Sequence, residues 1–559
     1  MKRFINGLCA AGCLALLSLT GCKDYLVEEN LGGRTAETYY GTAQGFEDLV
    51  KSTYSPLRPL LSYTGMFFLG TDIFTVTEVG STNAFNSYDN NLNSSNPDLD
   101  SYWKEAYYAI QLTNTVQFWS TQVTGLDAAT VATRVAETKA LRAYHYFLLA
   151  ETFGDVPLVL APATQPTFGF ARTPEKDVYT QVIKDLTEAI DGLPATTANF
   201  GRVTKGMAQH LLAKVYLTRG YKSYGAGQAD FTKAGQLAET LITSGPYALS
   251  SNFASLFDPS NAGFQVNSEV IFSVQYNANV ESSRYYYINN PSLLITGNGL
   301  HNLFNMEFQT YPTIGRSAYY GKSTLYIAPT SYLYTLFDKT RDARYQSTFA
   351  TAIYAQVATA GFAVGDTVIY FPDVPFSAAR KATKKYNVYN FDEYENKTSF
   401  SPRSLPYAQK FREVNVPYSD NNLGIRDTYV FRLAETYLIA SEAYLKAGDM
   451  AKAVQYYNVI RTRAGKTGTN PATNLPYKDE LKATSITIDN ILDERARELF
   501  GEELRWYELK RTGKLLERGK LYNKELAKYN RLQSFNLLRP IPQTQIDLNR
   551  ADFTQNPGY

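Results

Sequence analysis

Apolar residues recur along most of the chain with the spacing of amphipathic helices. The clearest stripe lies between Glu137 and Thr152, where large side chains stand at i, i+3, i+4, i+7 and i+8, on one helix face. It consists of Leu141, Tyr144, His145, Leu148 and Leu149. The helix should end in FGDVP at 153–157, because Gly and Pro terminate helices, and 156–160 should continue as extended chain. Similar periodicity predicts helices over about 44–57, 101–120, 175–191, 204–220, 230–244, 427–447, 450–464 and 486–512.

Two pairs of these helices resemble tetratricopeptide units, in which antiparallel helices cross at small residues flanked by aromatic ones. The clearer pair covers 434–465, where Gly448 suits a helix C-terminus and Asp449 can cap the next helix. The second pair has about nine more residues between its helices, and such insertions change loop entropy little. The pattern rests on Tyr437, Ala440, Ser441, Tyr444, Ala453 and Tyr457 in the first pair and on Leu212, Ala213, Tyr216, Ala234 and Ala238 in the second.

The predicted fold class is therefore mostly α, with tetratricopeptide-like helix pairs forming a scaffold, long irregular loops and a few short strands. The irregular tracts cover about 60–100 and about 245–425, where Asn, Ser, Gly, Pro and Tyr accumulate and Val270–Gln275 is one short predicted strand. Loops longer than about 15 residues inside a compact protein usually carry function. We expect the ligand site in these two tracts.

The N-terminus has the features of a lipoprotein signal peptide. Lys2 and Arg3 precede an apolar run that is too short to span a bilayer, and the run ends in Leu-Thr-Gly-Cys at 19–22. We predict a signal peptide over 1–21 and a fatty-acylated Cys22 as the mature N-terminus, with more than one acyl chain for stable anchoring. An ordinary signal peptide is the alternative. No window beyond Cys22 reaches spanning length.

Composition excludes some function classes. All three cysteines lie in or at the end of the leader, so the mature chain can form no internal disulfide. Without Lys2 and Arg3, the 55 basic residues become 53 and equal the 53 acidic ones, which argues against a nucleic-acid binder. The 44 tyrosines pair an apolar face with a hydroxyl, so they suit wet surfaces that bind sugars or peptides as well as helix packing.

The chain shows no catalytic or metal-binding motif. The three histidines stand singly, without ligand spacing, so we predict neither a metal site nor a cofactor. A glycosidase needs two carboxylates on opposite sides of a sugar bond, and the sequence gives no way to pair them. The densest acidic group alternates with arginines, and we interpret it as i,i+4 ion pairs on a solvated or interface face. This group comprises Asp493, Glu494, Glu498, Glu502 and Glu503 with Arg495, Arg497 and Arg505.

Several motifs in a fixed order resemble the SusD/RagB family of outer-membrane nutrient-binding lipoproteins of the Bacteroidota. The resemblance covers nearly the whole chain, and the QNPGY-like tail is its most diagnostic part. The motifs are TGC at 20–22, ALRAY at 140–144, FGDVPL at 153–158, GRVTKG at 201–206, RLAE at 432–435, IRTRAG at 460–465, the helix at 494–511, PIP at 540–542 and QNPGY at 555–559.

The resemblance implies a cell-surface lipoprotein that binds an oligosaccharide or polysaccharide and delivers it, without catalysis, to a SusC-like TonB-dependent outer-membrane transporter. It implies one large domain over 22–559, with an N-terminal part to about 245 and a C-terminal part from about 246 that includes the helix pair at about 427–465. The lipid on Cys22 would hold this domain on the outer membrane, facing the exterior. A peptide-binding RagB-type lid, a lipid-anchored glycoside hydrolase and a purely structural lid remain alternatives.

No motif fixes the ligand-binding residues of such a protein, because the binding loops vary most. The candidates are side chains that offer rings, amides or carboxylates to a sugar. We nominate Asp72, Phe74, Phe85, Tyr88 and Asn90 in the first tract and Tyr285, Tyr286, Tyr319 and Tyr320 in the second. The only tryptophans, Trp103, Trp119 and Trp506, lie on helical patterns, so a tryptophan platform of the starch-binding kind is not evident and a peptide ligand stays open.

Overall fold

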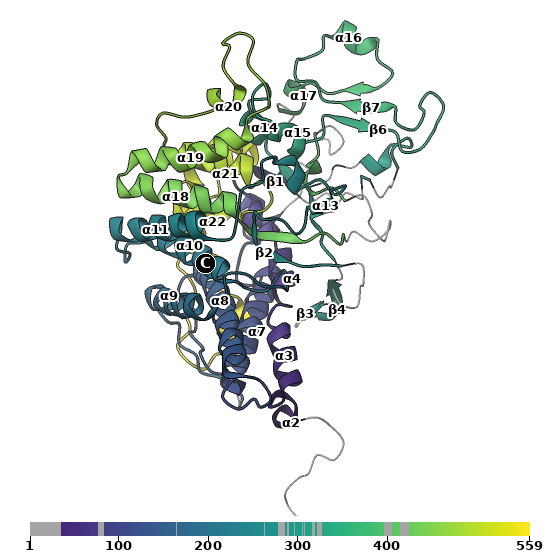
Figure 1. The fold of residues 1–559 in the computed structure, drawn as a ribbon. Helices are drawn as coiled ribbons and strands as arrows, with labels where there is room; N and C mark the ends of the chain where they lie inside the picture. The colour runs from purple at the N-terminus through teal and green to yellow at the C-terminus, as the bar shows by residue number, and fades with distance from the viewer. Residues whose placement is uncertain are drawn as a thin grey trace, which may run out of the picture.

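A computed structural model of the chain shows a helical body beside an irregular part with short strands (Figure 1). The helices stack on one side, and the short strands lie on the other. The structure describes residues 35–76, 83–163, 165–261, 263–277, 285–287, 290–295, 297–304, 306, 308–315, 319–320, 327–395, 405–413 and 424–559, and of 285–287 and 290–295 only the backbone.

Seven helices form a continuous array in which each packs against the next, from the bottom of Figure 1 to its upper left. The fifth and sixth helices are neighbours although residues 245–432 separate them in the sequence. The two tetratricopeptide-like pairs are thereby joined into one scaffold, and the predicted fold class is confirmed. The array consists of α7 (Pro97–Trp119), α8 (Ala128–Phe153), α9 (Glu175–Gly192), α10 (Lys205–Gly220), α11 (Gln228–Ser244), α18 (Leu433–Ala447) and α19 (Met450–Ala464).

Local sequence explains where these helices begin and end. Asn96 accepts hydrogen bonds from the backbone N–H groups of Asp98 and Leu99, and Pro97 occupies the first turn of α7. Gly448 ends α18 in the left-handed region with φ of 91°, and the Asp449 carboxylate accepts the N–H of Lys452 to cap α19. The predicted turn between the paired helices is confirmed.

Small residues let the paired helices approach closely. Ala440, Ala443 and Ala453 are buried, and the Ser441 hydroxyl donates to the Ala453 carbonyl at 2.8 Å. A larger side chain at the crossing would push the two helix axes apart. The repeat's pattern of small residues thus sets the spacing of the scaffold.

Antiparallel pairs of short strands connect the irregular part to the scaffold. β2 (Val270–Val274) confirms the predicted strand and pairs with β9 (Thr428–Arg432). The predicted helix over 427–447 is wrong in its first six residues. Buried Tyr429 and Phe431 alternate with the half-buried Thr428 and Val430, and they lie opposite Ser273 and Phe272 of β2, so this segment is a strand. The other strands are β1 (Phe74–Val76) paired with β5 (Ile327–Pro329), β3 (Tyr285–Tyr287) with β4 (Asn290–Ile295), and β6 (Ala352–Tyr354), β7 (Thr367–Tyr370) and β8 (Asn387–Val388) in one sheet.

The helix expected over 486–512 is two helices, α21 (Ile488–Glu498) and α22 (Arg505–Arg511). Gly501 lies between them with φ of 72°, and a Cβ there would stand 2.5 Å from the Phe411 ring. The backbone therefore turns sharply where only glycine fits. The break directs α22 toward α5 (Gly65–Phe68), with which it is in contact.

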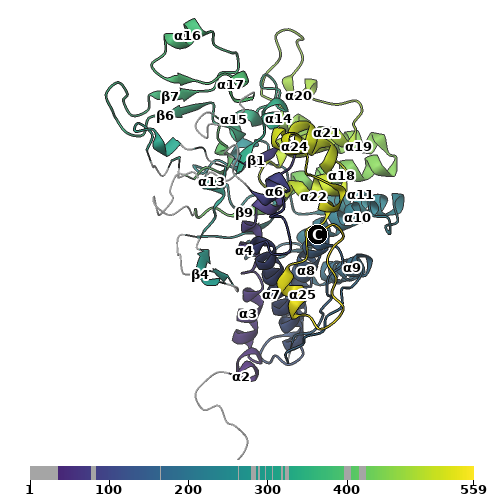
Figure 2. The ribbon, with the colours of Figure 1, turned by 180° about the vertical axis from the view of Figure 1, so that it is seen from behind.

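Shorter helices complete the described part of the chain. The predicted helix over 44–57 is α3, which ends at Ser52, followed by a separate α4. The C-terminal segment, with α25 beside α7, runs behind the scaffold (Figure 2). The shorter helices are α2 (Ala36–Tyr40), α3 (Ala43–Ser52), α4 (Leu57–Ser62), α6 (Ala84–Ser87), α13 (Leu300–Leu303), α14 (Ser331–Thr335), α15 (Arg344–Thr348), α16 (Ala378–Ala382), α17 (Phe391–Glu395), α20 (Tyr477–Glu480), α23 (Leu515–Tyr522), α24 (Lys524–Tyr529) and α25 (Gln543–Leu548).

The QNPGY tail fastens the C-terminus to the end of α8. The Asn556 amide donates to the backbone carbonyls of Phe153 and Arg539 at 2.9 and 2.8 Å, and the Gln555 amide donates to the Ile541 carbonyl. These bonds satisfy buried carbonyls, which explains why an amide side chain is needed at each position. None of the described helices is both long and apolar enough to cross a membrane.

Candidate functional site

Asp72, the first of the nominated residues, is buried and ion-paired. Its carboxylate lies 2.7 Å from Arg505 Nη2 and 2.8 Å from Arg518 Nε, and the side chain is fully shielded from solvent. Both arginines lower the pKa of Asp72 against the opposing effect of burial. Asp72 therefore joins segments of the core and does not face a ligand.

Phe74, Phe85 and Tyr88 are also buried, which corrects the expectation that their rings form a binding surface. Phe74 stacks between two other phenylalanines with ring centroids 5.2 and 5.6 Å away, and the Tyr88 hydroxyl donates to the Gly70 carbonyl at 3.1 Å. The guanidinium of Arg539 lies 5.3 and 5.5 Å from the ring centroids of Phe85 and Tyr88. Of the first-tract candidates, only Asn90 is exposed.

Two candidates of the second tract, Tyr319 and Tyr320, lie side by side in the irregular part. Tyr319 is half-buried, contacts Tyr320 edge to face at 4.8 Å, and has the Arg412 guanidinium 4.3 Å from its ring centroid. Tyr320 is buried, and its hydroxyl accepts the Tyr354 N–H at 2.8 Å. Tyr319 thus offers a partly open ring that an arginine holds in place.

Tyr285 and Tyr286 lie in β3, opposite Ile295 and Leu294 of β4. Their side chains lie outside the described part of the structure, as does Cys22, so their roles stay predictions.

The ion pairs around α21 are buried between segments, so of the two predicted alternatives, a solvated or an interface face, the solvated one is wrong. Glu494 and Glu498 are fully shielded, and Arg344 reaches them at 2.8 and 2.9 Å. Arg432 of the RLAE motif adds a third contact, to Glu498 at 3.1 Å. The alternating charges therefore fasten α21 to α15 and β9 instead of covering a helix surface.

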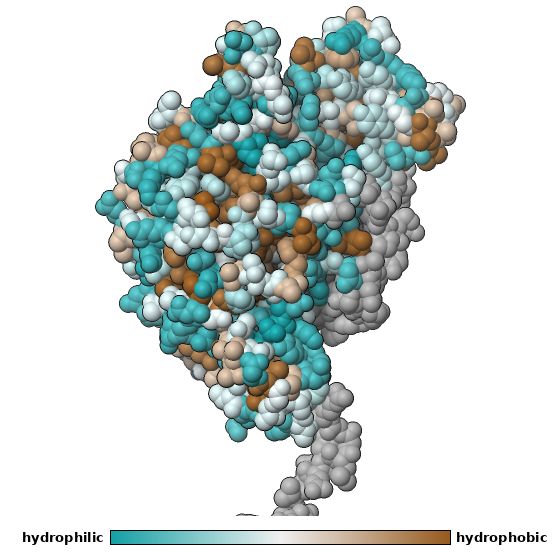
Figure 3. Space-filling model, in the orientation of Figure 1, coloured by the Kyte–Doolittle hydropathy of each residue, from teal (hydrophilic) through white to brown (hydrophobic). Residues whose placement is uncertain are grey.

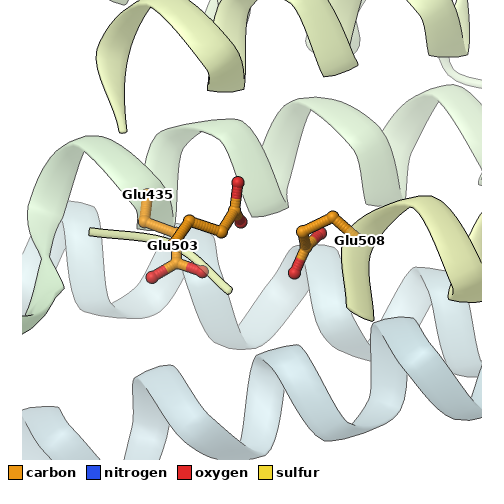
Figure 4. Close-up of side chains that lie close together, drawn as sticks. All are labelled: Glu435, Glu503 and Glu508. Atoms are coloured by element: carbon orange, nitrogen blue, oxygen red, sulfur yellow. The ribbon is translucent and has the colours of Figure 1, made fainter. Parts of the chain in front are cut away.

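Three buried glutamates lie close enough to suggest a metal centre. Glu435, Glu503 and Glu508 place carboxylate oxygens within 4.8 Å of one another (Figure 4). Lys214 lies 2.7 Å from Glu435 and 3.3 Å from Glu508, and Arg495 lies 3.0 Å from Glu435.

Protein cations already balance this carboxylate cluster. Arg495 also contacts Glu503, and Arg511 bridges Glu508 and Glu442. Burial and the nearby carboxylate of Glu508 raise the pKa of Glu503 to about 7, although Arg495 opposes the shift. Lys214, Arg495 and Arg511 therefore balance the charge of the cluster, and its residues do not fit a metal site.

Two cavities among the described residues have volumes of more than 400 Å³. One, of about 420 Å³, lies between α7 and the C-terminal segment, and its amide side chains are largely engaged internally: Asn549 bonds to both backbone groups of Phe170, at 2.7 and 3.0 Å. The other, of about 460 Å³, lies where α3 and α4 meet the turn at 199–202 and the end of β2. We call it the Arg58 cavity, and the residues important below are Tyr54, Arg58, Asn199, Phe200, Ser273 and Gln275.

Comparison with known proteins identifies the family to which this fold belongs. Residues 265–559 match the family model described as "SusD family". The chain belongs to the SusD family. Residues 45–217 match a second model, described as "Starch-binding associating with outer membrane". The resemblance inferred from the motifs is confirmed.

Relatives and solved structures of the SusD family align with almost the whole chain. The SusD-like protein P2 of Formosa agariphila is 25% identical over 97% of this chain and 98% of its own. The starch-binding protein SusD of Bacteroides thetaiotaomicron is 25% identical over 79% of this chain and 76% of its own. A solved laminarin-binding SusD-like protein superposes with a TM-score of 0.69 at 23% identity, over 93% of this chain and all of that one, which shows a common fold.

The nominations from sequence missed Arg58 and Arg412 in this SusD-family chain. Arg58 is close in sequence to none of its cavity partners at 199–202 and 273–275, and Arg412 stands 93 residues from Tyr319. The one local signal for this cavity was the turn NFGR at 199–202, because binding residues often lie on loops.

Proposed function

We propose that this SusD-family protein binds an oligosaccharide or polysaccharide at the cell surface and hands it, unchanged, to a SusC-like TonB-dependent transporter in the outer membrane. The observation that carries the proposal is the SusD-family match over 265–559. Relatives named for binding starch and laminarin support a glycan in preference to a peptide.

The surface chemistry is compatible with sugar binding. Tyr319 presents a partly open ring beside Arg412, and Asn90 offers an exposed amide. Rings contact the C–H faces of sugars, while amides and guanidinium groups bond their hydroxyls. On the described part of the face in Figure 3, apolar residues form separate patches divided by hydrophilic surface, as expected for a surface that remains wet.

The proposal excludes hydrolysis. The densest group of carboxylates in the described structure is buried and paired with arginines and a lysine, so it does not face a substrate. A glycosidase requires two carboxylates that flank an accessible sugar bond. The lipid-anchored hydrolase therefore has no support from the described acidic residues.

The proposed location combines the leader with the family. The leader predicts lipidation at Cys22, and the family model over 45–217 is described by its association with the outer membrane. The lipid anchor, the outward orientation and the transporter partner are parts of the proposal.

Calorimetry of the full-length lipoprotein in detergent, against a panel of soluble glycans and peptides, tests the proposal. We expect micromolar or weaker binding to a glycan, no binding of peptides, and no release of reducing ends. Tyr319→Ala should weaken glycan binding about three- to tenfold, the scale of one aromatic contact. Tyr477→Ala, which changes a half-buried tyrosine of α20, is the matched control. Appearance of new reducing ends, or binding of peptides alone, would contradict the proposal.

A further inference from the structure

The Arg58 cavity has the size of a small-ligand site. Its volume of about 460 Å³ lies within the range of about 300–1,000 Å³ that is usual for such sites. The chain brings it together from α4, the turn before α10, and the end of β2. Gly201 makes this assembly possible: its φ is 92°, and a Cβ would lie 2.6 Å from the Gln275 side chain.

The lining of the Arg58 cavity is positively charged. It includes Lys51, Arg58 and Arg202 and no aspartate or glutamate. Two of these cations pair with carboxylates that are not part of the lining. Lys51 lies 3.1 Å from Asp48, and Arg202 lies 2.9 Å from Glu137. The excess of charge therefore resides on Arg58.

Arg58 has no carboxylate partner among the described residues. Its Nε and Nη2 donate to the Gln275 carbonyl at 3.4 and 3.2 Å, and its guanidinium lies 5.6 Å from the ring centroid of Tyr276. A guanidinium has five N–H donors, so these two bonds leave three. A planar fork with free donors binds a carboxylate or a sulfate through two parallel hydrogen bonds.

The pKa values of Arg58 and Arg202 are shifted in opposite directions, which again shows that only Arg202 has carboxylate partners. Burial lowers the pKa of Arg58, and only Tyr276 opposes this effect. The carboxylates of Glu137 and Glu47 raise the pKa of Arg202 in spite of its burial. An anion beside Arg58 would supply the compensation that Arg202 already has.

Neutral groups around Arg58 have the chemistry that recognises sugars. Tyr54 and Phe200 are half-buried aromatic residues, and Asn199 and Gln275 are exposed amides. Ser273 is among the lining residues, but its hydroxyl is shielded from solvent, so Asn199 and Gln275 are the amide side chains that a ligand in the cavity can reach.

We infer that the Arg58 cavity binds a sugar unit bearing a carboxylate or sulfate group, with the anion on Arg58 and the sugar hydroxyls on Asn199 and Gln275. The glycan recognised by this protein is accordingly acidic. The inference rests on the proposed function, which it extends by naming the substrate class.

Affinity measurements with matched ligands test the inference on the unmodified protein. The full-length lipoprotein in detergent is titrated with a galacturonate hexamer, with the same hexamer after its carboxyl groups have been reduced to alcohols, and with a sulfated galactan hexamer. We expect the acidic hexamers to bind about tenfold or more tightly than the reduced one, and their binding to weaken as salt rises. A preference for carboxylate or for sulfate identifies which anion the site prefers. Equal binding of the reduced hexamer would overturn the inference.

Variants then assign the effect to Arg58. Arg58→Ala should reduce affinity for the acidic hexamer about tenfold or more, the scale of one lost charge-assisted pair, and leave the reduced hexamer unaffected. Arg58→Lys keeps the charge without the fork and should fall between the two. Lys384→Ala removes an exposed lysine after α16 and is the control for net charge. Unchanged affinity in a folded Arg58→Ala protein would contradict the assignment.

The outcomes separate this inference from the proposed function. If no glycan of any charge binds, the proposed function fails. If neutral glycans bind as tightly as acidic ones, only the inference fails. If poly-glutamate binds as tightly as the galacturonate hexamer, the site recognises negative charge alone, and the assignment to a sugar is overturned.

Discussion

Asp72 shows why a single residue can mislead when its partners are distant in sequence. Within its own segment it is a polar residue in a loop-like tract, which is typical of a ligand contact. Its arginine partners stand 433 and 446 residues later, so no local pattern could reveal the pairing. A buried carboxylate between two arginines acts on stability instead of binding.

Asp72→Asn should therefore lower the free energy of unfolding by about 3–5 kcal/mol, because it leaves the buried Arg505 without its carboxylate and removes one of the three carboxylates that contact Arg518. The lowered pKa means that the ion pairs contribute fully above the ordinary aspartate value of 3.8. The difference between wild type and variant should persist from neutral pH to that value and disappear as the pH falls further, toward the lowered pKa. Urea unfolding at several pH values measures it.

Asp191→Asn is the control for the Asp72 experiment, since Asp191 is exposed at the end of α9. We expect this variant to unfold within about 0.5 kcal/mol of wild type. An Asp72→Asn protein as stable as the control would show that the buried pairs do not hold the core.

Helices and turns were predicted well where the residues that determine them are close together in the sequence. The stripe at 141–149 and the Gly448-Asp449 turn carry their own periodicity and caps, and both α8 and the α18–α19 pair match the expectation. The predictions failed where contact with a distant segment determines the local structure. Residues 428–432 form a strand because β2 is available to pair with them. After α21 the chain turns at Gly501, where the distant Phe411 ring leaves no room for a larger residue.

The turn at Gly501 provides an element-scale prediction. Gly501→Ala places a Cβ in the left-handed region, which costs about 1–2 kcal/mol, and also drives it against Phe411, which adds about 1–3 kcal/mol. Gly513→Ala shares the first effect alone, because Gly513 has φ of 70° and open space around it. Urea unfolding of the two variants should therefore give a larger loss at Gly501. Equal losses would mean that the Phe411 ring moves aside.

The sequence allowed the ligand surface to be proposed only as a region. The expectation that 60–100 and 245–425 carry function rests on their composition, and the structure brings Tyr319 and Arg412 of the second tract together. The Arg58 cavity combines residues from α3, α4, the turn at 199–202 and the end of β2, of which only β2 belongs to these tracts. Periodicity describes one element at a time, so it cannot show which side chains share a cavity.

At the scale of the whole molecule, one scaffold is built from two stretches of chain. α11 packs against α18 across an insertion of residues 245–432, and buried ion pairs such as Arg463 of α19 with Glu269, at 3.1 Å, connect the insertion to the scaffold. Buried ion pairs fix geometry more than they add stability, because desolvation offsets much of their attraction. The irregular part is thus held in a defined position on the helices, as a binding surface requires.

The proposed attachment to the membrane concerns the molecule as a whole, because one lipidated residue, Cys22, would hold the entire domain at the surface. Cys22→Ala should move the protein from the membrane fraction to the soluble fraction and abolish incorporation of labelled palmitate, since the acyl chains supply the binding energy. Cys13→Ala removes another leader cysteine, which lies within the predicted signal peptide, and should leave both measurements unchanged. Retention of Cys22→Ala in washed membranes would mean that contact with a membrane partner, instead of the lipid, holds the domain in place.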